Sequence, residues 1–290
     1  MSATQICVIG SVNLDLVVRC ETLPRPGETL LGGQFASLPG GKGANQALAA
    51  RRLGAGVCLI GKVGRDAHAE QALALLRVGG VDLSACSRSD HHPTGVALIT
   101  VAADGENQIV VAPGANSDLA VSDLPERIDT ALIGQLEIPT PVLEAAVTRC
   151  TGFISLNLAP ARPLPDRLIA AADLLVVNET EADFYGLEKL HASGAAIALT
   201  LGADGAILFR NGKEVARARP PEVVVVDTVG AGDAFVAAIT LALIEGRPDD
   251  EALAYACGVG ALATTRHGAQ TGLPNAAEIA TLMAATGEKS

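Results

Sequence analysis

The feature that most constrains the fold is a glycine turn near the C-terminal end, set between two apolar stretches. Residues 223–226 are four consecutive valines, which predicts a buried strand, and residues 234–244 are almost wholly apolar, which predicts a helix. The turn between them contains Gly230, Gly232 and Asp233. A glycine turn at a helix N-terminus leaves backbone N–H groups free at the positive end of the helix dipole. The sequence therefore predicts an anion site within an α/β fold.

Asp233 is an unexpected residue at such a turn, because a carboxylate repels the anion that the turn attracts. Beside a phosphate, an acid has a use if it accepts the proton of an attacking hydroxyl, as a general base does in phosphoryl transfer. An aspartate in the first turn of a helix is also a common partner of the helix dipole. From this motif alone, both interpretations stay open.

The rest of the chain alternates short apolar runs with segments of helical pattern, which predicts a Rossmann-like, mostly parallel sheet flanked by helices in one domain, residues 1–290. The expected strands are 5–10, 57–63, 131–137, 153–157, 174–178 and 196–201. The expected helices are 44–53, 66–78, 141–150, 165–171, 249–265 and 275–285, and residues 287–290 are expected to be a disordered tail. Residues 207–210 and 213–218 are expected to form a hairpin through Asn211-Gly212.

One region interrupts this alternation. The β-rich runs 94–102 and 108–112 are joined through Asp104-Gly105, a strong hairpin signal. Together with the extended region 13–36, in which 28–36 has a partly alternating pattern, this hairpin is expected to build a small separate β layer. Its position in the chain predicts a lid that closes over a ligand and keeps water out.

Polar residues stand where ligands bind in open parallel sheets, beyond the carboxyl ends of the strands. Glu137, Asn157 and Asn178 each end an expected strand. Asn13 and Asp15 share one face of an extended segment, which suits either a clamp for two hydroxyl groups or a solvated strand face.

Composition narrows the class of partner. Acidic residues outnumber basic ones, 32 to 21, which argues against nucleic acid or an anionic membrane surface. Aromatic residues make up 2% of the chain, so no stacking platform for bases is expected. The six cysteines are scattered without a C-x-x-C pair, and neither a signal peptide nor an apolar run of the roughly 20 residues that span a membrane is evident. These features predict a cytoplasmic protein.

Taken together, the motifs resemble those of the ribokinase/PfkB family of carbohydrate kinases over residues 5–285. Two of them carry most of the resemblance, GGKGANQA at 40–47 and DTVGAGD at 227–233. GSVNLD at 10–15, QLE at 135–137, NETE at 178–181 and TLGADG at 200–205 follow in the order and spacing of the family.

The resemblance implies a role for each of these motifs. Asp233 would be the base that activates a sugar hydroxyl, and the backbone N–H groups of Gly230, Ala231, Gly232 and Asp233 would bind the transferring phosphoryl group. The implied sugar-site residues are Asn13, Leu14, Asp15, Gly41, Lys42, Gly43, Ala44, Asn45, Glu137 and Asp233. The implied ATP-site residues are Asn178, Thr200, Leu201, Gly202, Ala203, Asp204, Gly205, Gly232, Asp233 and Cys257.

Two cations are implied as well. Mg²⁺ would be held by Glu181 and Asn178 through water, although acidic residues in the first turn of a helix also serve as dipole partners. A monovalent cation, K⁺, would lie beside the anion hole at Asp227, Val229, Ala263, Arg266, Gly268 and Gly272. This chain has Gly272 where the family often has serine, and Cys257 where it often has asparagine.

The implied reaction is ATP-dependent phosphorylation of D-ribose at its 5-hydroxyl to D-ribose 5-phosphate, by a homodimer that buries the apolar face of the lid. Two alternatives stay open. The acceptor could be another small sugar or a nucleoside, such as deoxyribose or a ketohexose, or the chain could be a sugar-binding regulator without catalysis.

Overall fold

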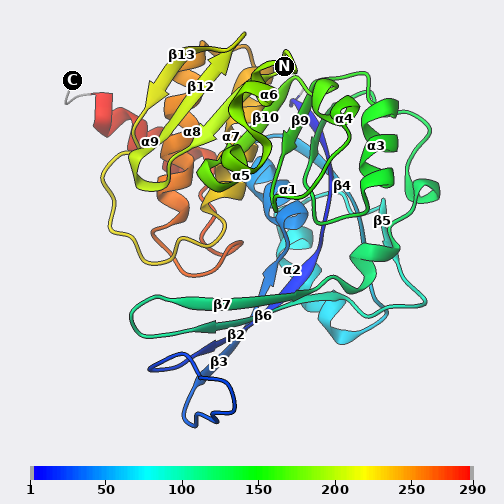
Figure 1. The fold of residues 1–290 in the computed structure, drawn as a ribbon, viewed down its shortest axis with the longest axis vertical. Coiled ribbons are helices and arrows are strands. Elements are labelled where there is room, and N and C mark those ends of the chain that lie inside the picture. Colours follow the sequence, from blue (N-terminus) through cyan, green and yellow to red (C-terminus); the bar gives the residue numbers. More distant parts are fainter. Residues whose placement is uncertain (1–2, 288–290) are drawn as a thin grey trace.

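The computed structural model describes residues 3–287, and within them a large sheet carries helices on both faces (Figure 1). The strand order is β13-β12-β11-β10-β9-β8-β1-β4-β5. These strands are β1 (Gln5–Ile9), β4 (Gly56–Val63), β5 (Cys86–Arg88), β8 (Ala131–Gly134), β9 (Ile154–Asn157), β10 (Leu174–Asn178), β11 (Ala196–Thr200), β12 (Ala206–Arg210) and β13 (Lys213–Ala218). All neighbours from β5 to β11 are parallel, and the hairpin β12–β13 adds two antiparallel strands.

The core lies on both faces of this sheet, because successive strand side chains point to opposite sides. Ile6 and Val8 of β1 pack into one cluster, whereas Cys7 and Ile9 pack into the other. The first face is covered by α1 (Lys42–Arg52), α2 (Ala67–Gly79), α7 (Ala231–Ile244), α8 (Asp249–Ala263) and α9 (Ala276–Gly287). The second is covered by α3 (Thr140–Arg149), α4 (Asp166–Ala170), α5 (Glu179–Tyr185) and α6 (Leu187–His191).

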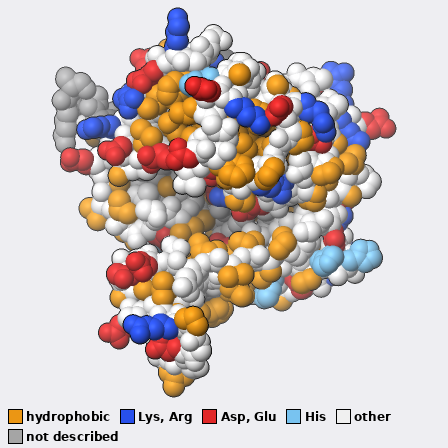
Figure 2. Space-filling model, viewed as in Figure 1, with side chains coloured by type: hydrophobic (Ala, Val, Ile, Leu, Met, Phe, Trp, Pro, Cys, Tyr) orange, Lys and Arg blue, Asp and Glu red, His pale blue; other side chains and the backbone are white. Residues whose placement is uncertain are grey.

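A second, four-stranded sheet projects from this body (Figure 1). It has the order β3-β2-β6-β7, from β2 (Asn13–Arg19), β3 (Gln34–Gly40), β6 (Gly95–Val101) and β7 (Asn107–Ala112). The predicted separate β layer is therefore present. Figure 2 shows the face of the molecule hollowed between the body and this small sheet.

Most predicted elements are present with small shifts at their ends, and β10 has the predicted bounds. β8 ends at Gly134, three residues before Glu137, and β3 occupies 34–40 where 28–36 was expected to be extended. Residues 288–290 of the expected tail lie outside the described chain, and Gly287 is the last residue of α9. Within residues 3–287, no helix is both long and apolar enough to cross a bilayer.

The prediction of a buried strand at residues 223–226 is wrong. This segment is an irregular loop in which Val224 and Val225 are 83% and 59% exposed. The sheet already ends at β13, and Pro220 and Pro221, which lack the N–H donors of a ladder, lead the chain away from it. Without a neighbouring strand, a valine run cannot be buried in a sheet.

Candidate active site

The candidate site lies where the carboxyl ends of the parallel strands meet the small sheet and the first turns of α1 and α7. Asn157 and Asn178 are the last residues of β9 and β10, and Thr200 is the last residue of β11. Glu137 comes shortly after β8. The polar residues that end successive strands are thus brought to one edge of the sheet, as the topology of an open α/β fold dictates.

The glycine turn at the start of α7 has the geometry of an anion site. Gly230 is the N-cap residue with φ +83°, and no side chain of the described chain caps the helix. A Cβ atom on Gly230 would lie 2.8 Å from the backbone of Ala269, so glycine is needed here for space as well as for conformation. The helix begins at Ala231, three residues earlier than predicted, which places Asp233 in its first turn.

Asp233 is 7% exposed, and side-chain amides of α1 donate hydrogen bonds to both oxygens of its carboxylate. Nδ2 of Asn45 donates to Oδ2 at 2.8 Å, and Nε2 of Gln46 donates to Oδ1 at 2.9 Å. Burial raises the pKa of Asp233, and the charge of Lys42 together with the two amide donors offsets part of this rise.

Lys42 carries a positive charge that three nearby acids stabilise. Burial by itself would lower the pKa of Lys42, but the carboxylates of Asp233, Glu137 and Glu181 outweigh burial and raise it. Lys42 lines a cavity of about 150 Å³ together with Asn178, Glu181, Gly230 and Asp233. The ammonium group is therefore charged and is placed among groups that would otherwise repel one another.

The predicted hydroxyl clamp is buried against the other site residues. Burial, followed by the charges of Glu137 and Asp233, raises the pKa of Asp15 to about 7. A Cβ atom on Gly40 would lie within 2.4 Å of this carboxylate, so the glycine leaves room for it. Oδ1 of Asn13 accepts a hydrogen bond from Nδ2 of Asn116 at 2.7 Å. Asn13 and Asp15 are therefore buried and do not form a solvated strand face, which was one of the two interpretations that the sequence allowed.

The loop between β3 and α1 brings its backbone against the first strand. Gly41, with φ +91°, precedes α1, and a Cβ atom on Gly43 would lie 2.5 Å from the backbone of Gly10. Oε2 of Glu137 accepts from Oγ of Ser11 at 2.5 Å and from the backbone N–H of Lys42 at 3.2 Å. Leu14 and Ala44, also expected at the sugar site, are fully buried in the apolar core, so their backbones alone can face a ligand.

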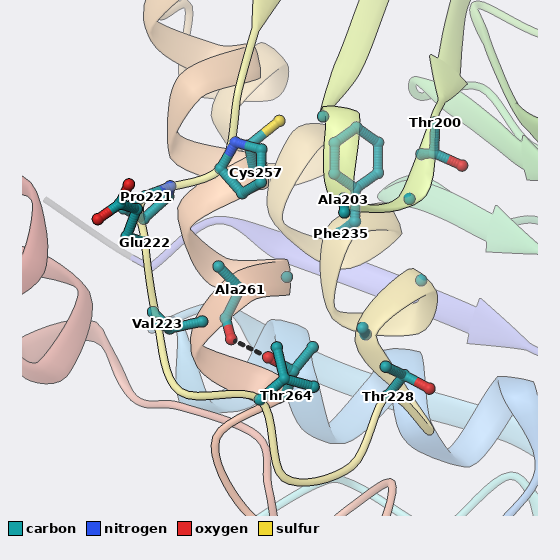
Figure 3. A pocket seen from close by; sticks show the side chains of 17 residues that line it. Thr200, Ala203, Pro221, Glu222, Val223, Thr228, Phe235, Cys257, Ala261 and Thr264 are labelled. Atoms are coloured by element: carbon teal, nitrogen blue, oxygen red, sulfur yellow. Dashed lines mark hydrogen bonds between the residues drawn. The ribbon is translucent and has the colours of Figure 1, made fainter. Parts of the chain in front are cut away.

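A larger cavity of about 520 Å³ adjoins the smaller one at Thr200 and Gly232 (Figure 3). Of the expected nucleotide residues, Gly202, Ala203, Gly205 and Cys257 line it, whereas Leu201 and Asp204 are not among its lining residues. The thiol of Cys257 is buried and has a pKa raised to about 11 by that burial, so it is neutral. Phe235, Val223 and Val225 complete much of the apolar lining, which the sequence analysis had not anticipated.

Asn178 and Glu181 cap α5 reciprocally, so the structural interpretation of these residues holds. Oδ1 of Asn178 accepts from the N–H of Glu181, and Oε2 of Glu181 accepts from the N–H of Asn178, both at 2.8 Å. Oε1 of Glu181 has no hydrogen-bond donor among the described residues, and the residue lines the smaller cavity. Burial raises the pKa of Glu181, against the effects of the Asn178 N–H and of Lys42. One carboxylate oxygen thus remains for a hydrated cation such as Mg²⁺.

The residues expected to hold a monovalent cation come together beside the glycine turn. Carbonyl oxygens of Ala263, Gly268 and Arg266 lie 2.8, 3.0 and 3.1 Å from the point where a side chain on Gly272 would begin. Asp227 accepts hydrogen bonds from the N–H groups of Val229 and Gly268, both at 3.0 Å. The carbonyl oxygens around Gly272 are of the kind that ligate a monovalent cation, and Asp227 is joined to the same loop through the N–H of Gly268. In residues 3–287, no three His, Cys, Asp or Glu side chains form a metal-binding group.

Three buried amide side chains that hydrogen-bond to the site residues were not identified from the sequence. Gln46 and Gln135 are both 0% exposed, and Nε2 of Gln135 donates to Oε1 of Gln46 at 2.8 Å. Asn116 is a further partner of the clamp, through its bond to Asn13. Gln46 and Gln135 stand inside the quoted motifs, but their contacts join residues 89 and 187 positions apart, and a one-dimensional pattern does not reveal such pairs.

Comparison with known proteins agrees with this geometry. The family model described as pfkB family carbohydrate kinase matches residues 3–276. A ribokinase of Bacillus subtilis is 42% identical, with 96% of this chain and 99% of that protein aligned. The ribokinase structure from Thermotoga maritima superposes with a TM-score of 0.87 at 30% identity, covering 97% of this chain and 99% of that one. Arabidopsis thaliana ribokinase, solved with ribose and ATP, gives 0.83 at 30% identity, with the same coverage. The chain belongs to the pfkB family of carbohydrate kinases.

Proposed function

We propose that this chain transfers the γ-phosphoryl group of ATP to the 5-hydroxyl of D-ribose, giving D-ribose 5-phosphate and ADP. The observation that carries the proposal is the placement of Asp233. This buried carboxylate lies in the first turn of α7, where Asn45 and Gln46 donate to it. It lines the smaller cavity, which adjoins the nucleotide-sized cavity at Gly232. Similarity to ribokinases over nearly the whole chain supports the choice of substrate.

In the proposed reaction, Asp233 accepts the proton of the 5-hydroxyl. The hydroxyl oxygen bonds to the γ-phosphorus, and the bond between the γ-phosphorus and the oxygen bridging it to the β-phosphate breaks. The N–H groups from Gly230 to Asp233 would face the charge on the transferring group, and that of Ala231 also donates to the carbonyl of Thr228 at 3.3 Å. Lys42 adds a positive charge beside them. The chain therefore supplies positioning and charge neutralisation rather than a covalent intermediate.

The proposed sugar site uses polar atoms that the protein leaves available. Oδ1 of Asn45 is buried and has no hydrogen-bond partner among the described residues, so a sugar hydroxyl would satisfy it. Asp15 and Glu137, whose charge acts on Asp15, would add further acceptors, and Asn13 would add its amide group, whose Oδ1 already accepts from Asn116. The backbones of Gly41, Lys42 and Gly43 would line the start of α1 beside them. A hydroxyl-rich ligand fits this lining better than a flat base would.

Two cations complete the proposal. Mg²⁺ would be held by Glu181 and Asn178 through water, and when bound with ATP it neutralises phosphate charge. K⁺ would be held by Asp227 and the carbonyl oxygens around Gly272, where it adds positive charge beside the anion turn. The glycine at position 272 supplies no side-chain ligand, so water is expected in that place.

The small sheet is proposed to be the lid and the dimer interface. Its exposed apolar side chains are Val18, Phe35, Leu98, Ile109, Val110 and Val111. By the strand register, Val18, Phe35, Leu98 and Val110 share one face of the small sheet, and Ile109 and Val111 lie on the other. A second copy of the chain would cover the first of these faces. A cytoplasmic location is proposed because all six cysteines are free thiols, as is usual in a reducing compartment.

The direct test is ADP release with ATP and Mg²⁺ against D-ribose, deoxyribose, ketohexoses and nucleosides, each with and without K⁺. Turnover on D-ribose well above the other acceptors is the expected result. Preferred turnover on another acceptor would retain the mechanism and reassign the substrate. Absence of turnover on every acceptor, with ribose still bound, would indicate a sugar-binding regulator and overturn the proposal.

A further inference from the structure

We propose that Gln46 is a positioning residue for phosphoryl transfer, and that Gln135 sets its orientation. The two form a buried amide chain that points hydrogen-bond donors at Asp233 and holds that carboxylate in its orientation and ionised. This inference rests on the proposed role of Asp233 and concerns how the fold maintains it.

The direction of the chain follows from its hydrogen bonds. Nε2 of Gln135 donates to Oε1 of Gln46, at 2.8 Å, so the amide nitrogen of Gln46 must face the other way. That nitrogen donates to Oδ1 of Asp233 at 2.9 Å and to Oδ1 of Asn157 at 3.3 Å. Asn157 in turn donates through Nδ2 to the carbonyl of Val176 at 3.3 Å.

A reversed Gln46 amide would turn its oxygen toward two other oxygens. An ionised carboxylate is only an acceptor, and Oδ1 of Asn157 is also an acceptor, so the reversed amide would lose both bonds and face repulsion. Gln135 thereby acts on Asp233 without touching it. Since Gln46 and Gln135 are 0% exposed, water does not replace a lost donor at low cost.

Two glycines leave space for the amide pair of Gln46 and Gln135. A Cβ atom on Gly10 would lie 1.9 Å from Oε1 of Gln135 and 2.7 Å from Cα of Gly43. The two glycines therefore leave the space in which the Gln135 side chain and the first turn of α1 approach each other. The family motifs GSVNLD and GGKGANQA contact each other at these two glycines.

The charged groups around Asp233 explain why a donor is needed. Lys42 of α1 faces it with a positive charge, while Asp15 of β2 and Glu137, after β8, add negative charge. Burial raises the pKa of Asp233, and the bonds from Asn45 and Gln46 oppose that rise. Loss of the Gln46 donor leaves burial less opposed, so the base would be protonated at a higher pH.

The test combines a titration with kinetics on the full-length protein. Gln46→Met keeps the length of the side chain and removes its hydrogen bonds, and Gln135→Met removes only the orienting donor. Gln71→Met, at an exposed glutamine of α2, is the matched control. Carboxyl titration by carbon NMR with labelled aspartate, assigned with Asp233→Asn, reports the pKa of Asp233 without any need for turnover.

We expect Gln46→Met to raise the pKa of Asp233 by roughly one unit, and to lower kcat about 10–100-fold at neutral pH, with the acid limb of the kcat profile displaced upward. Gln135→Met should raise the pKa of Asp233 and lower kcat as well, by smaller amounts. In both variants the KM for sugar should change less than about 3-fold, and the Gln71→Met control should match the wild type. A purely structural role would lower the folded fraction without moving the pH profile.

The outcomes separate the two proposals. An Asp233 pKa that is unchanged in both variants would overturn the inference, whatever the activity. A raised pKa in a protein whose wild type phosphorylates no acceptor would leave the amide chain established and reject the kinase function. If Gln46→Met does not fold, Gln135→Met decides, since it leaves the contact between Gln46 and Asp233 in place.

Discussion

The two sides of the candidate site are built differently. On the acceptor side, where the sugar that accepts the phosphoryl group is proposed to bind, buried polar groups hold one another by hydrogen bonds. Gln135 donates to Gln46, and Gln46 and Asn45 both donate to Asp233. On the donor side, the cavity of about 520 Å³ is lined largely by glycines and apolar side chains, and Val224 beside it is 83% exposed. The acceptor side is thus organised before any ligand arrives, whereas the donor side offers surfaces and backbone groups.

This difference predicts how strongly single substitutions on each side of the site should act. Removing one member of a buried polar network leaves its partners unsatisfied, so single changes on the acceptor side should have large effects. An apolar wall spreads its contribution over many contacts, so single changes on the donor side should have small effects.

The largest effect is expected from Asp233→Asn, which keeps the shape of the base but cannot accept the proton. We expect kcat to fall by at least roughly 100-fold, while ribose still binds. Steady-state kinetics and calorimetric titration with ribose measure the two quantities. Asp104→Asn, at the tip of the β6–β7 hairpin, is the control, and near-normal turnover of Asp233→Asn would remove its assigned role.

Asp15→Ala should act on sugar affinity rather than on ATP. It leaves sugar hydroxyls without an acceptor, and we expect binding to weaken by roughly 1–3 kcal/mol, with the KM for ATP little changed. Calorimetry with D-ribose gives the value. Unchanged sugar affinity would place Asp15 outside the sugar contact.

Asp15 should also make stability depend on pH. Its pKa of about 7 in the folded protein exceeds the value of about 3.9 for an unfolded aspartate, so the folded state binds this proton more tightly. The contribution is present below about pH 4 and is lost as the pH rises to about 7. Asp15→Asn should therefore raise the free energy of unfolding by roughly 1–3 kcal/mol at about pH 8 relative to its effect at about pH 4. Urea denaturation at both values measures this, and a pH-independent difference would contradict the pKa.

A smaller effect is expected from Asp227, which is proposed to hold K⁺. Asp227→Asn should remove the response to K⁺, about 3–10-fold in kcat if the bound charge is worth roughly 1 kcal/mol, and leave ribose affinity unchanged. Turnover in matched K⁺ and choline buffers tests this. An undiminished K⁺ response in the variant would place the cation elsewhere.

The smallest effect is expected from a residue that lines the larger cavity, where ATP is proposed to bind. Cys257→Ala removes a neutral buried thiol from a surface of many contacts, so the KM for ATP should change less than about 3-fold. A change of more than about 30-fold, or roughly 2 kcal/mol, would show that Cys257 makes a specific contact and that the donor side is less diffuse than its lining suggests.

Much of the fold could be predicted, because strand and helix periodicity is a local property. The bounds of β10, the hairpin β6–β7 and the separate small sheet all follow from patterns of neighbouring residues. Residues 223–226 could not be predicted in the same way, because four valines form a strand only where they pair with a neighbouring strand, and this segment leaves the sheet after β13 as an irregular loop. Such a fact belongs to the tertiary arrangement.

The residues of the candidate site also fall into those that the sequence identified and those that it did not. Asp233 could be named from its place at the glycine turn, and Lys42 and Asn45 from the resemblance of their motif to the family; the structure brings the three together. The supporting amides of Gln46, Gln135 and Asn116 could not be assigned, because a buried glutamine in a helix or after a strand gives no sign of the group that it faces. Only the meeting of β1, β8 and α1 shows it.

The most direct test of the central claim is to follow ATP, Mg²⁺ and D-ribose with the protein by phosphorus NMR. The account predicts that D-ribose 5-phosphate and ADP accumulate in equal amounts, and that Asp233→Asn forms neither at a comparable rate. Release of inorganic phosphate without a sugar phosphate, or a sugar phosphate formed equally well by Asp233→Asn, would contradict it.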